Sequence, residues 1–156
     1  MFVSNSSGFH KYKDPVDGEI YTYTHLEPFN CNRWFPCFDQ PSIRAPMSMR
    51  VFTSEANWTA ISNENLLKKL PVHSSEAKAV INKEQLMPSL NRLKIEEQGN
   101  LFIFDTCPPI STYIYALAVG PYVAIPNLSD YRVPMKIYCR KTKVALAEPE
   151  ERFRTI

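Results

Sequence analysis

The stretch that decides the fold is Arg33-Trp34-Phe35-Pro36-Cys37-Phe38-Asp39-Gln40-Pro41. It places three aromatic residues, one thiol and two prolines in nine positions, with Arg33 and Asp39 as its two charged residues. Proline lacks a backbone donor and clashes with a preceding helical turn, and each proline holds the residue before it in extended geometry. We therefore expect a rigid, irregular and largely buried corner between two strands.

Asp39 is the residue of this corner that most needs partners, because an unpaired charge in apolar surroundings is costly. Aspartates at turns commonly accept hydrogen bonds from nearby backbone N–H groups. We expect Asp39 to be satisfied in this way, or by Arg33. Taken alone, the stretch indicates a structural role.

Several motifs flank the corner and continue in order along the chain: Tyr23-Thr24-His25-Leu26-Glu27-Pro28, Ile61-Ser62-Asn63, Phe104-Asp105-Thr106-Cys107-Pro108-Pro109-Ile110-Ser111-Thr112-Tyr113, Val119-Gly120-Pro121-Tyr122 and Val133-Pro134-Met135-Lys136-Ile137-Tyr138-Cys139. Together with Arg33 and the segment 35–41 they resemble the N-terminal domain of the aminopeptidase N family, which are zinc-dependent exopeptidases of the gluzincin type. The resemblance covers residues 8–143. It implies an all-β fold, a sheet or sandwich with a short helical or irregular insertion.

Strand patterns support an all-β fold independently of the resemblance. Residues 19–26 are rich in β-branched and aromatic residues, and residues 47–51 alternate apolar and polar side chains, although Pro46 should distort the start of that strand. Residues 57–61, 101–104 and 136–140 are expected to be further strands. Residues 112–119 are nearly all apolar, which predicts a strand buried on both faces at the core of the sheet.

The chain is interpreted as a single partial domain over residues 1–156. Residues 64–100 hold many of its lysines and glutamates and are predicted to be a surface insertion, either merely solvated or a docking element for a partner. A short helix is expected from Ser75, with Ser75 as its N-cap, and Pro88 limits its length. Residues 144–156 read as a charged tail, either a short helix or a frayed end.

Composition excludes several classes of protein. The net charge of +2 is too small to indicate nucleic-acid binding, and no apolar run approaches the length of a membrane span. Residues 1–7 lack the features of a signal peptide, so we expect an intracellular protein, cytoplasmic or within a large cytoplasmic or organellar assembly. The four cysteines are expected to be reduced and mostly buried, although their even number permits disulfides.

The catalytic motifs of a zinc peptidase are missing from the sequence. A gluzincin holds zinc through H-E-x-x-H, but none of the three histidines, His10, His25 and His73, is followed by glutamate. The G-A-M-E-N loop of the family is missing too, since none of the four glycines precedes alanine. We therefore expect no catalytic residue, no metal ligand and no cofactor in this chain. In the family, zinc belongs to a catalytic domain that follows this region.

One ligand-binding residue is implied by the resemblance. In the family a glutamate at the position of Glu27 reaches into the active site and binds the free α-amine of the substrate. A carboxylate is a suitable partner for an ammonium group. The glutamine that accompanies this glutamate in the family is His25 here. Glu27 and His25 are thus expected to be the relic of an amine subsite, and Glu27 works only if another chain supplies the catalytic part. A separate structural motif, with no role in binding, is expected from Arg33, Phe35, Pro36, Cys37, Phe38, Asp39 and Pro41.

Three functions remain open. The first is a non-catalytic structural or interaction subunit of a larger assembly, and the starting methionine and charged tail favour a finished protein of this kind. The second is one piece of a split zinc aminopeptidase, and the third is a truncated fragment of such an enzyme. In each case the partners are expected to be other protein chains, which bind exposed strand edges and the apolar face around Leu26, Phe29 and Trp34.

Overall fold

The computed structural model describes residues 8–84, 98–125 and 136–146. In these residues the elements follow one another as β1 (Gly8–Lys13), β2 (Ile20–His25), η1 (Cys31–Arg33), β3 (Arg44–Met47), β4 (Arg50–Thr53), β5 (Thr59–Ser62), β6 (Leu66–Pro71), α1 (Ser75–Lys83), β7 (Asn100–Phe104), β8 (Cys107–Ser111), η2 (Thr112–Ile114), β9 (Leu117–Gly120), β10 (Val123–Ile125), β11 (Ile137–Cys139) and η3 (Lys141–Leu146). The η elements are short 3-10 helices.

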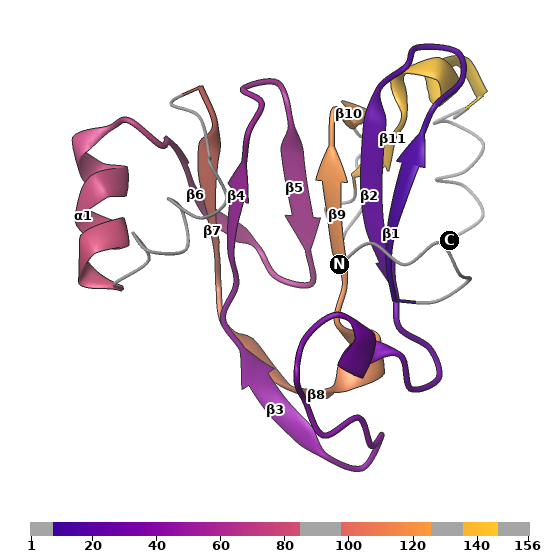
Figure 1. Ribbon diagram of the computed structural model, residues 1–156, viewed down its shortest axis with the longest axis vertical. Helices are drawn as coiled ribbons and strands as arrows, with labels where there is room; N and C mark the ends of the chain where they lie inside the picture. The colour runs from indigo at the N-terminus through magenta and orange to yellow at the C-terminus, as the bar shows by residue number, and fades with distance from the viewer. Residues whose placement is uncertain (1–7, 85–97, 126–135, 147–156) are drawn as a thin grey trace, which may run out of the picture.

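The strands form two neighbouring sheets and two ribbons (Figure 1). One sheet has the order β1-β2-β9-β5 and the other β4-β7-β6, while β3 pairs with β8 and β10 with β11. Every one of these pairings is antiparallel. The β3–β8 ribbon continues below the sheets in Figure 1, next to the loop that carries η1. The prediction of an all-β fold is confirmed.

The main core joins the two sheets. It is built from Val51 on β4, Ala60 on β5, Phe102 on β7 and Val119 on β9, with Trp34 and Trp58 packed against it. The strand predicted at 101–104 is confirmed as β7, whose five residues are all buried. Both faces of β7 are covered, since Phe102 and Phe104 lie in the main core while Leu101 and Ile103 pack under α1.

The predicted strand over residues 112–119 is wrong in its first half. Thr112–Ile114 form η2, and only Leu117–Gly120 form a strand, β9, which lies between β2 and β5. The side chain of Asn63 interrupts the run, because its Oδ1 accepts the Ala116 N–H at 2.7 Å and its Nδ2 donates to the Ile114 carbonyl at 3.0 Å. The Asn63 side chain, just after β5, therefore takes the place of the backbone hydrogen bonds that a neighbouring strand would make to an unbroken strand here.

The strand predicted at 47–51 is also divided. β3 ends at Met47 and β4 begins at Arg50, so the chain leaves one sheet and joins another within three residues. The β3–β8 register shifts between Ala45 and Met47. Pro46 lies at this shift and has no N–H to donate, so the expected distortion at Pro46 is present.

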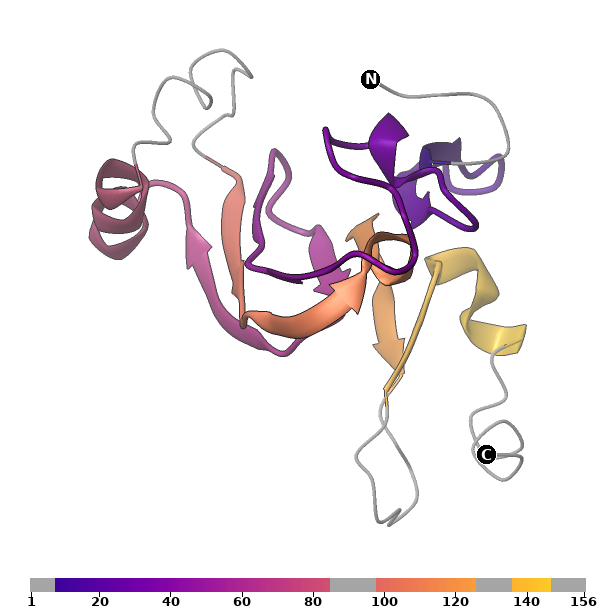
Figure 2. The same ribbon diagram turned by 90° about the horizontal axis from the view of Figure 1, so that it is seen from below.

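The segment 64–100 contributes to the sheet as well as to the surface. β6 is largely exposed but pairs with β7 along its length, and α1 covers this flank with Ala77 and Ile81, which pack on Leu101 and Ile103 (Figure 2). The N-cap of α1 is Ser74, not Ser75, because the Ser74 hydroxyl accepts the Ala77 N–H at 3.2 Å. Pro88 lies outside the described residues.

At the other end of the chain, η3 occupies Lys141–Leu146, and the remainder of the predicted charged tail lies outside the described residues. In the described part of the chain, no helix has the length and apolar character needed to cross a membrane.

Candidate functional site

The turn after β2 carries Glu27 on a firmly held backbone. Leu26 anchors it, being 2% exposed in a cluster with Cys31, Cys107 and Tyr115. Asn30 closes it, because its backbone N–H donates to the Leu26 carbonyl at 2.8 Å and its side chain donates to the Glu27 carbonyl at 2.7 Å. The Glu27–Pro28 peptide is cis. The backbone is fixed while the Glu27 side chain stays exposed.

The corner at 33–41 is tied down mainly through Asp39. Its Oδ2 accepts the backbone N–H of Asn32 at 3.1 Å, and its Oδ1 accepts the Thr112 hydroxyl at 2.7 Å. The expected partner, a backbone amide, is therefore present, and Thr112 is a second partner that the sequence did not indicate. Asp39 joins η1 to η2 across 73 positions of the sequence.

The expectation of a largely buried corner is wrong. Phe38 is 80% exposed, and Pro36, Gln40 and Pro41 are exposed too. Local turns satisfy the backbone here, since the Gln40 N–H donates to the Phe38 carbonyl and the Ile43 N–H donates to the Gln40 carbonyl, both at 2.9 Å. Because these groups find partners locally, the corner does not need to pack into the core. Three side chains of the corner pack inward: Trp34, Phe35 and Cys37.

A hollow of about 380 Å³ lies where the turn, the corner and η2 meet. Glu27, Pro28, Pro41 and Tyr113 line it. The Ser111 hydroxyl donates to the Pro41 carbonyl at 2.6 Å and holds the corner against the start of η2. Three segments of the chain therefore form one concave surface, and among its described lining residues Glu27 alone carries a carboxylate.

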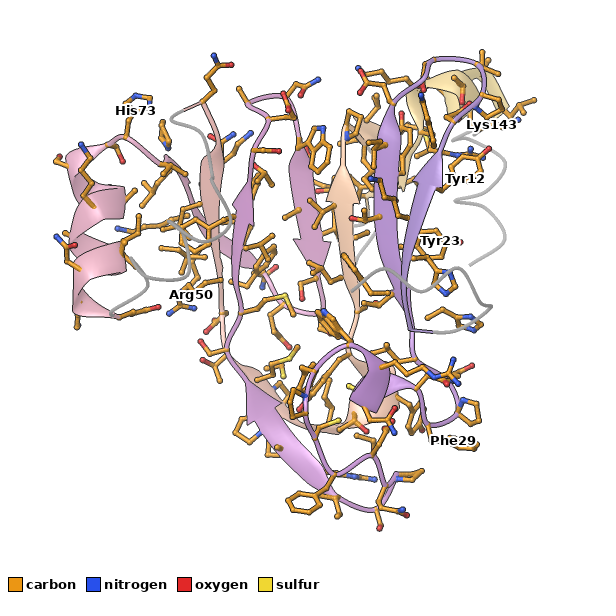
Figure 3. All side chains as sticks on the ribbon, in the orientation of Figure 1. Tyr12, Tyr23, Phe29, Arg50, His73 and Lys143 are labelled. Carbon is orange, nitrogen blue, oxygen red and sulfur yellow. The ribbon has the colours of Figure 1, made fainter. Side chains whose placement is uncertain are left out.

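The Glu27 carboxylate is not used by the fold. Within residues 8–84, 98–125 and 136–146 it makes no hydrogen bond or ion pair. Phe29, two positions on, is 63% exposed and points away from the body at this end of the molecule (Figure 3). An exposed carboxylate in a hollow of proline and tyrosine can accept hydrogen bonds from a cationic amine.

His25 does not join Glu27 in the hollow. It lies on β2 opposite Gly8, and its ring is 6.2 Å from the ring of His10, which stacks on Tyr23 at 5.1 Å. The predicted pairing of His25 with Glu27 in one subsite therefore has no support in the geometry. In the part of the chain that the structure describes, no three His, Cys, Asp or Glu residues are grouped to hold a metal ion.

The apolar face predicted around Leu26, Phe29 and Trp34 is only partly present. Leu26 belongs to the core, and Trp34 is half-buried, stacked 6.1 Å from Phe9 and edge-on to Phe35 at 5.3 Å. Phe29 alone is exposed. Leu26 is drawn inward because the Asn30 cap folds the turn over it.

The opposite end of β2 holds a second carboxylate in contrasting surroundings. Asp14 is 2% exposed and accepts hydrogen bonds from the Val16 N–H at 3.0 Å, the Thr142 hydroxyl at 2.7 Å and Arg140 at 2.9 Å. The hydrogen bonds from the Val16 N–H and then from the Thr142 hydroxyl lower the pKa of Asp14. Burial opposes them, and the positive charges of Arg140 and Lys143 add smaller contributions that lower the pKa further. Figure 3 labels Lys143 and Tyr12 at this end.

Comparison with known proteins points to one family. The sequence matches the "Peptidase M1 N-terminal domain" over residues 3–91. It is similar to "Aminopeptidase N" of Streptomyces lividans, with 30% identity over 142 residues, 89% of this chain and 13% of that protein. It is also similar to "Aminopeptidase 2, mitochondrial" of Saccharomyces cerevisiae (25% identity, 86% of this chain, 12% of that protein) and "Glutamyl aminopeptidase" of Mus musculus (26%, 90% and 13%). The chain thus spans about an eighth of the length of these relatives.

Proposed function

We infer the function of this chain from its family: it belongs to the M1 peptidases and carries their N-terminal domain, as the resemblance of its motifs implied. From this premise we propose that it acts as a non-catalytic interaction module in a larger assembly. In that assembly it presents Glu27 as a binding group for a free amine, while any peptide cleavage depends on a zinc-binding partner.

The observation that carries this proposal is the free Glu27 carboxylate. The fold uses Asn30, Asp39 and Ser111 to fix the walls of the hollow, yet no described residue pairs with the Glu27 carboxylate in its lining. A charged group held at a fixed place and not needed for stability is typical of a ligand-binding position. A primary ammonium fits such a group in charge and in hydrogen-bonding capacity.

Other protein chains are the proposed partners. Among the described strands, β6 lies at one edge of its sheet, and it exposes Leu66 (44%) and Leu67 (57%). Phe29 and Phe38 add exposed aromatic surface in the two loops that border the hollow. Unpaired strand edges and exposed apolar side chains both favour association with another chain.

A second candidate function is that of one part of a zinc aminopeptidase. The names of the relatives favour it, since those proteins are called aminopeptidases and are about eight times longer than the matched segment. Under this proposal Glu27 contributes to an active site, and the zinc ligands of that site belong to another part of the enzyme. Zinc is the only cofactor that the proposal requires, and it would be held by that other part.

Amine recognition can be tested on the chain itself. We expect a dipeptide with a free N-terminus to shift backbone amide NMR signals of residues 27–30 and Tyr113, whereas its N-acetylated form leaves them unchanged. Glu27→Gln should abolish the response because it removes the charge but keeps the shape. Glu55→Gln is the matched control, since Glu55 is exposed and lies outside the hollow. Equal shifts with both peptides would contradict an amine subsite.

The non-catalytic part of the proposal has a separate test. The purified chain should contain no stoichiometric zinc and should not hydrolyse aminoacyl arylamides. Stoichiometric zinc together with chelator-sensitive hydrolysis would show that this chain is itself a peptidase.

A further inference from the structure

Three thiols converge beneath the Glu27 turn. Cys31 is 0% exposed and Cys107 is 3% exposed, and both belong to the small core cluster with Leu26 and Tyr115. Cys37 is half-buried and packs against the same cluster. All three are free thiols. The corner therefore brings together residues from η1, from its own centre and from β8.

The backbone of η1 explains why Cys37 returns to Cys31. The Trp34 and Phe35 N–H groups both donate to the Cys31 carbonyl, at 2.8 and 3.1 Å, which curls the chain around Cys31. The Asp39 carboxylate then closes the loop on the Asn32 N–H. As a result, the Cys37 side chain packs against the same buried cluster that contains Cys31.

The two thiols of this pair differ in reactivity. Burial first, and then the hydrogen bond and proximity of Cys37, raise the pKa of the Cys31 thiol to about 12. A thiol of such high pKa is almost entirely protonated near neutral pH and reacts slowly with disulfides in solution. Cys37 is the more accessible of the two. The pair thus has an outer thiol that oxidants can reach and an inner thiol that they cannot.

Cys107 is a less suitable partner for Cys37. Its sulfur already accepts the Met47 N–H at 3.2 Å, and it lies on strand β8, outside the corner that carries Cys37. Burial is the main cause that raises the pKa of Tyr115, and Cys107, Cys31 and Cys37 contribute after it, so the three thiols surround one phenol. The Tyr115 hydroxyl itself is engaged, since it donates to the Ala45 carbonyl at 2.7 Å.

We propose that Cys31 and Cys37 form a reversible intrachain disulfide, with a small-molecule disulfide such as oxidised glutathione as the oxidant. The Cys37 thiolate attacks one sulfur of the oxidant, a mixed disulfide forms, and one glutathione thiolate leaves. Cys31 then loses its proton, attacks the Cys37 sulfur and displaces the second glutathione thiolate. The two protein thiols lose two electrons and two protons, and the oxidant becomes two molecules of glutathione.

The bond would link η1 to the centre of the corner that borders the Glu27 hollow. Asn30, which closes the Glu27 turn, immediately precedes Cys31. Oxidation is therefore positioned to change the mobility of the turn and corner together. This inference does not rest on the proposed amine binding.

The test is equilibration of the reduced, folded chain in glutathione redox buffers, followed by acid quench, alkylation under denaturing conditions and peptide mass spectrometry. We expect two peptides joined by a Cys31–Cys37 disulfide, with a mass about 2 Da below the sum of the two reduced peptides. Cys107 and Cys139 should still be alkylated. The same equilibrium in urea should give an effective thiol concentration at least about tenfold lower than in the folded chain, because the folded corner holds the two thiols together.

Variants separate the roles of the two thiols. Cys31→Ser should accumulate the mixed disulfide of glutathione on Cys37, whereas Cys37→Ser should leave Cys31 reduced. Cys139→Ser is the matched control and should oxidise like the wild type, since Cys139 lies on β11 outside this cluster. A dominant Cys37–Cys107 link, or a cross-link no more favourable in the folded chain than in urea, would overturn the proposal. The wild-type measurement decides it even if a variant does not fold.

Discussion

The two ends of β2 each carry a carboxylate, and the fold treats them in opposite ways. Before the strand, Asp14 is buried and accepts from a backbone amide, a hydroxyl and a guanidinium. After the strand, Glu27 is exposed and none of the described residues pairs with its carboxylate. Both sit in turns whose backbones are closed by hydrogen bonds. The difference lies in the side chain alone.

This contrast separates a carboxylate that makes the fold from one that the fold presents. Removal of the first leaves a buried cation, a hydroxyl and an amide without their acceptor, which is costly. Removal of the second leaves nothing in the described structure unsatisfied. Loss of Asp14 should therefore lower stability more than loss of Glu27. Loss of Glu27 should weaken ligand binding more than loss of Asp14.

The largest effect is expected for Asp14→Ala. We expect a fall in melting temperature of roughly 5 °C or more, because Arg140, Thr142 and the Val16 N–H all lose their acceptor. The matched control is Asp17→Ala in the same turn, whose carboxylate accepts from Glu19 and Tyr21 but is exposed. Thermal unfolding followed by circular dichroism measures both. If the two variants melt together, burial of Asp14 contributes nothing and the contrast fails.

Acid should remove the same contribution without mutation. Because the pKa of Asp14 is lowered in the folded protein, its ionised form stabilises the fold at pH values above the unfolded-state pKa of about 3.9. That stability is lost as pH falls below this value and through the folded pKa. The gap in unfolding free energy between wild type and Asp14→Asn should therefore shrink on acidification from pH 5 toward pH 2. A gap that is constant across this range would show that Asp14 acts only through shape.

An intermediate effect is expected at the corner. Asp39→Ala should lower the free energy of unfolding by about 1–3 kcal/mol, since it leaves the Asn32 N–H and the Thr112 hydroxyl without their acceptor. Thr112→Val removes only one of these bonds and should cost less, about 0.5–1.5 kcal/mol. A double-mutant cycle from urea unfolding measures the coupling of the two residues. Additive costs would mean that Asp39 does not join η1 to η2.

The smallest effect on stability is expected for Glu27→Gln, within about 0.5 kcal/mol of wild type, as for an exposed side chain without partners. Urea unfolding provides the measurement, and its midpoint and slope should both be unchanged. A clear loss of stability would show that Glu27 is structural after all, and the two ends of β2 would then be alike.

The sequence predicted the class of the fold because its signals there are local. The β-branched run of β2 and the apolar residues of β7 determine strands by their own side chains. Pro46 likewise marked the irregular start of its strand. Asp39 was expected to accept a backbone amide, and it does so over seven positions.

Predictions failed where residues distant in sequence decide the structure. The break between η2 and β9 depends on Asn63, which lies 53 positions before Ala116. Thr112 and Asp39 meet across 73 positions, so no local pattern indicates their bond. β6 is a strand because β7 offers it an edge, although its own residues are mostly leucine and lysine in exposed positions.

The candidate site was predicted in part. Glu27 was identified by the resemblance of its motif, while the hollow's other walls, Pro41 and Tyr113, come from segments that only the fold brings together. The corner was expected inside because it is apolar, but its backbone is satisfied by its own turns and it stays at the surface. The apolar composition of the corner therefore did not predict its exposure.

The Asp14 turn also has a consequence for the time course of folding. The Asp14 carboxylate accepts hydrogen bonds from Arg140, 126 positions away, and from Thr142, 128 positions away. Strand β2 likewise gains its second neighbour only when β9 is present. Contacts of such separation slow folding, because the chain loses its freedom before the contact forms. During synthesis, the first hairpin emerges long before the residues that complete it. Until then the unpaired edge of this hairpin is open to aggregation, and chaperones are the natural means to cover it.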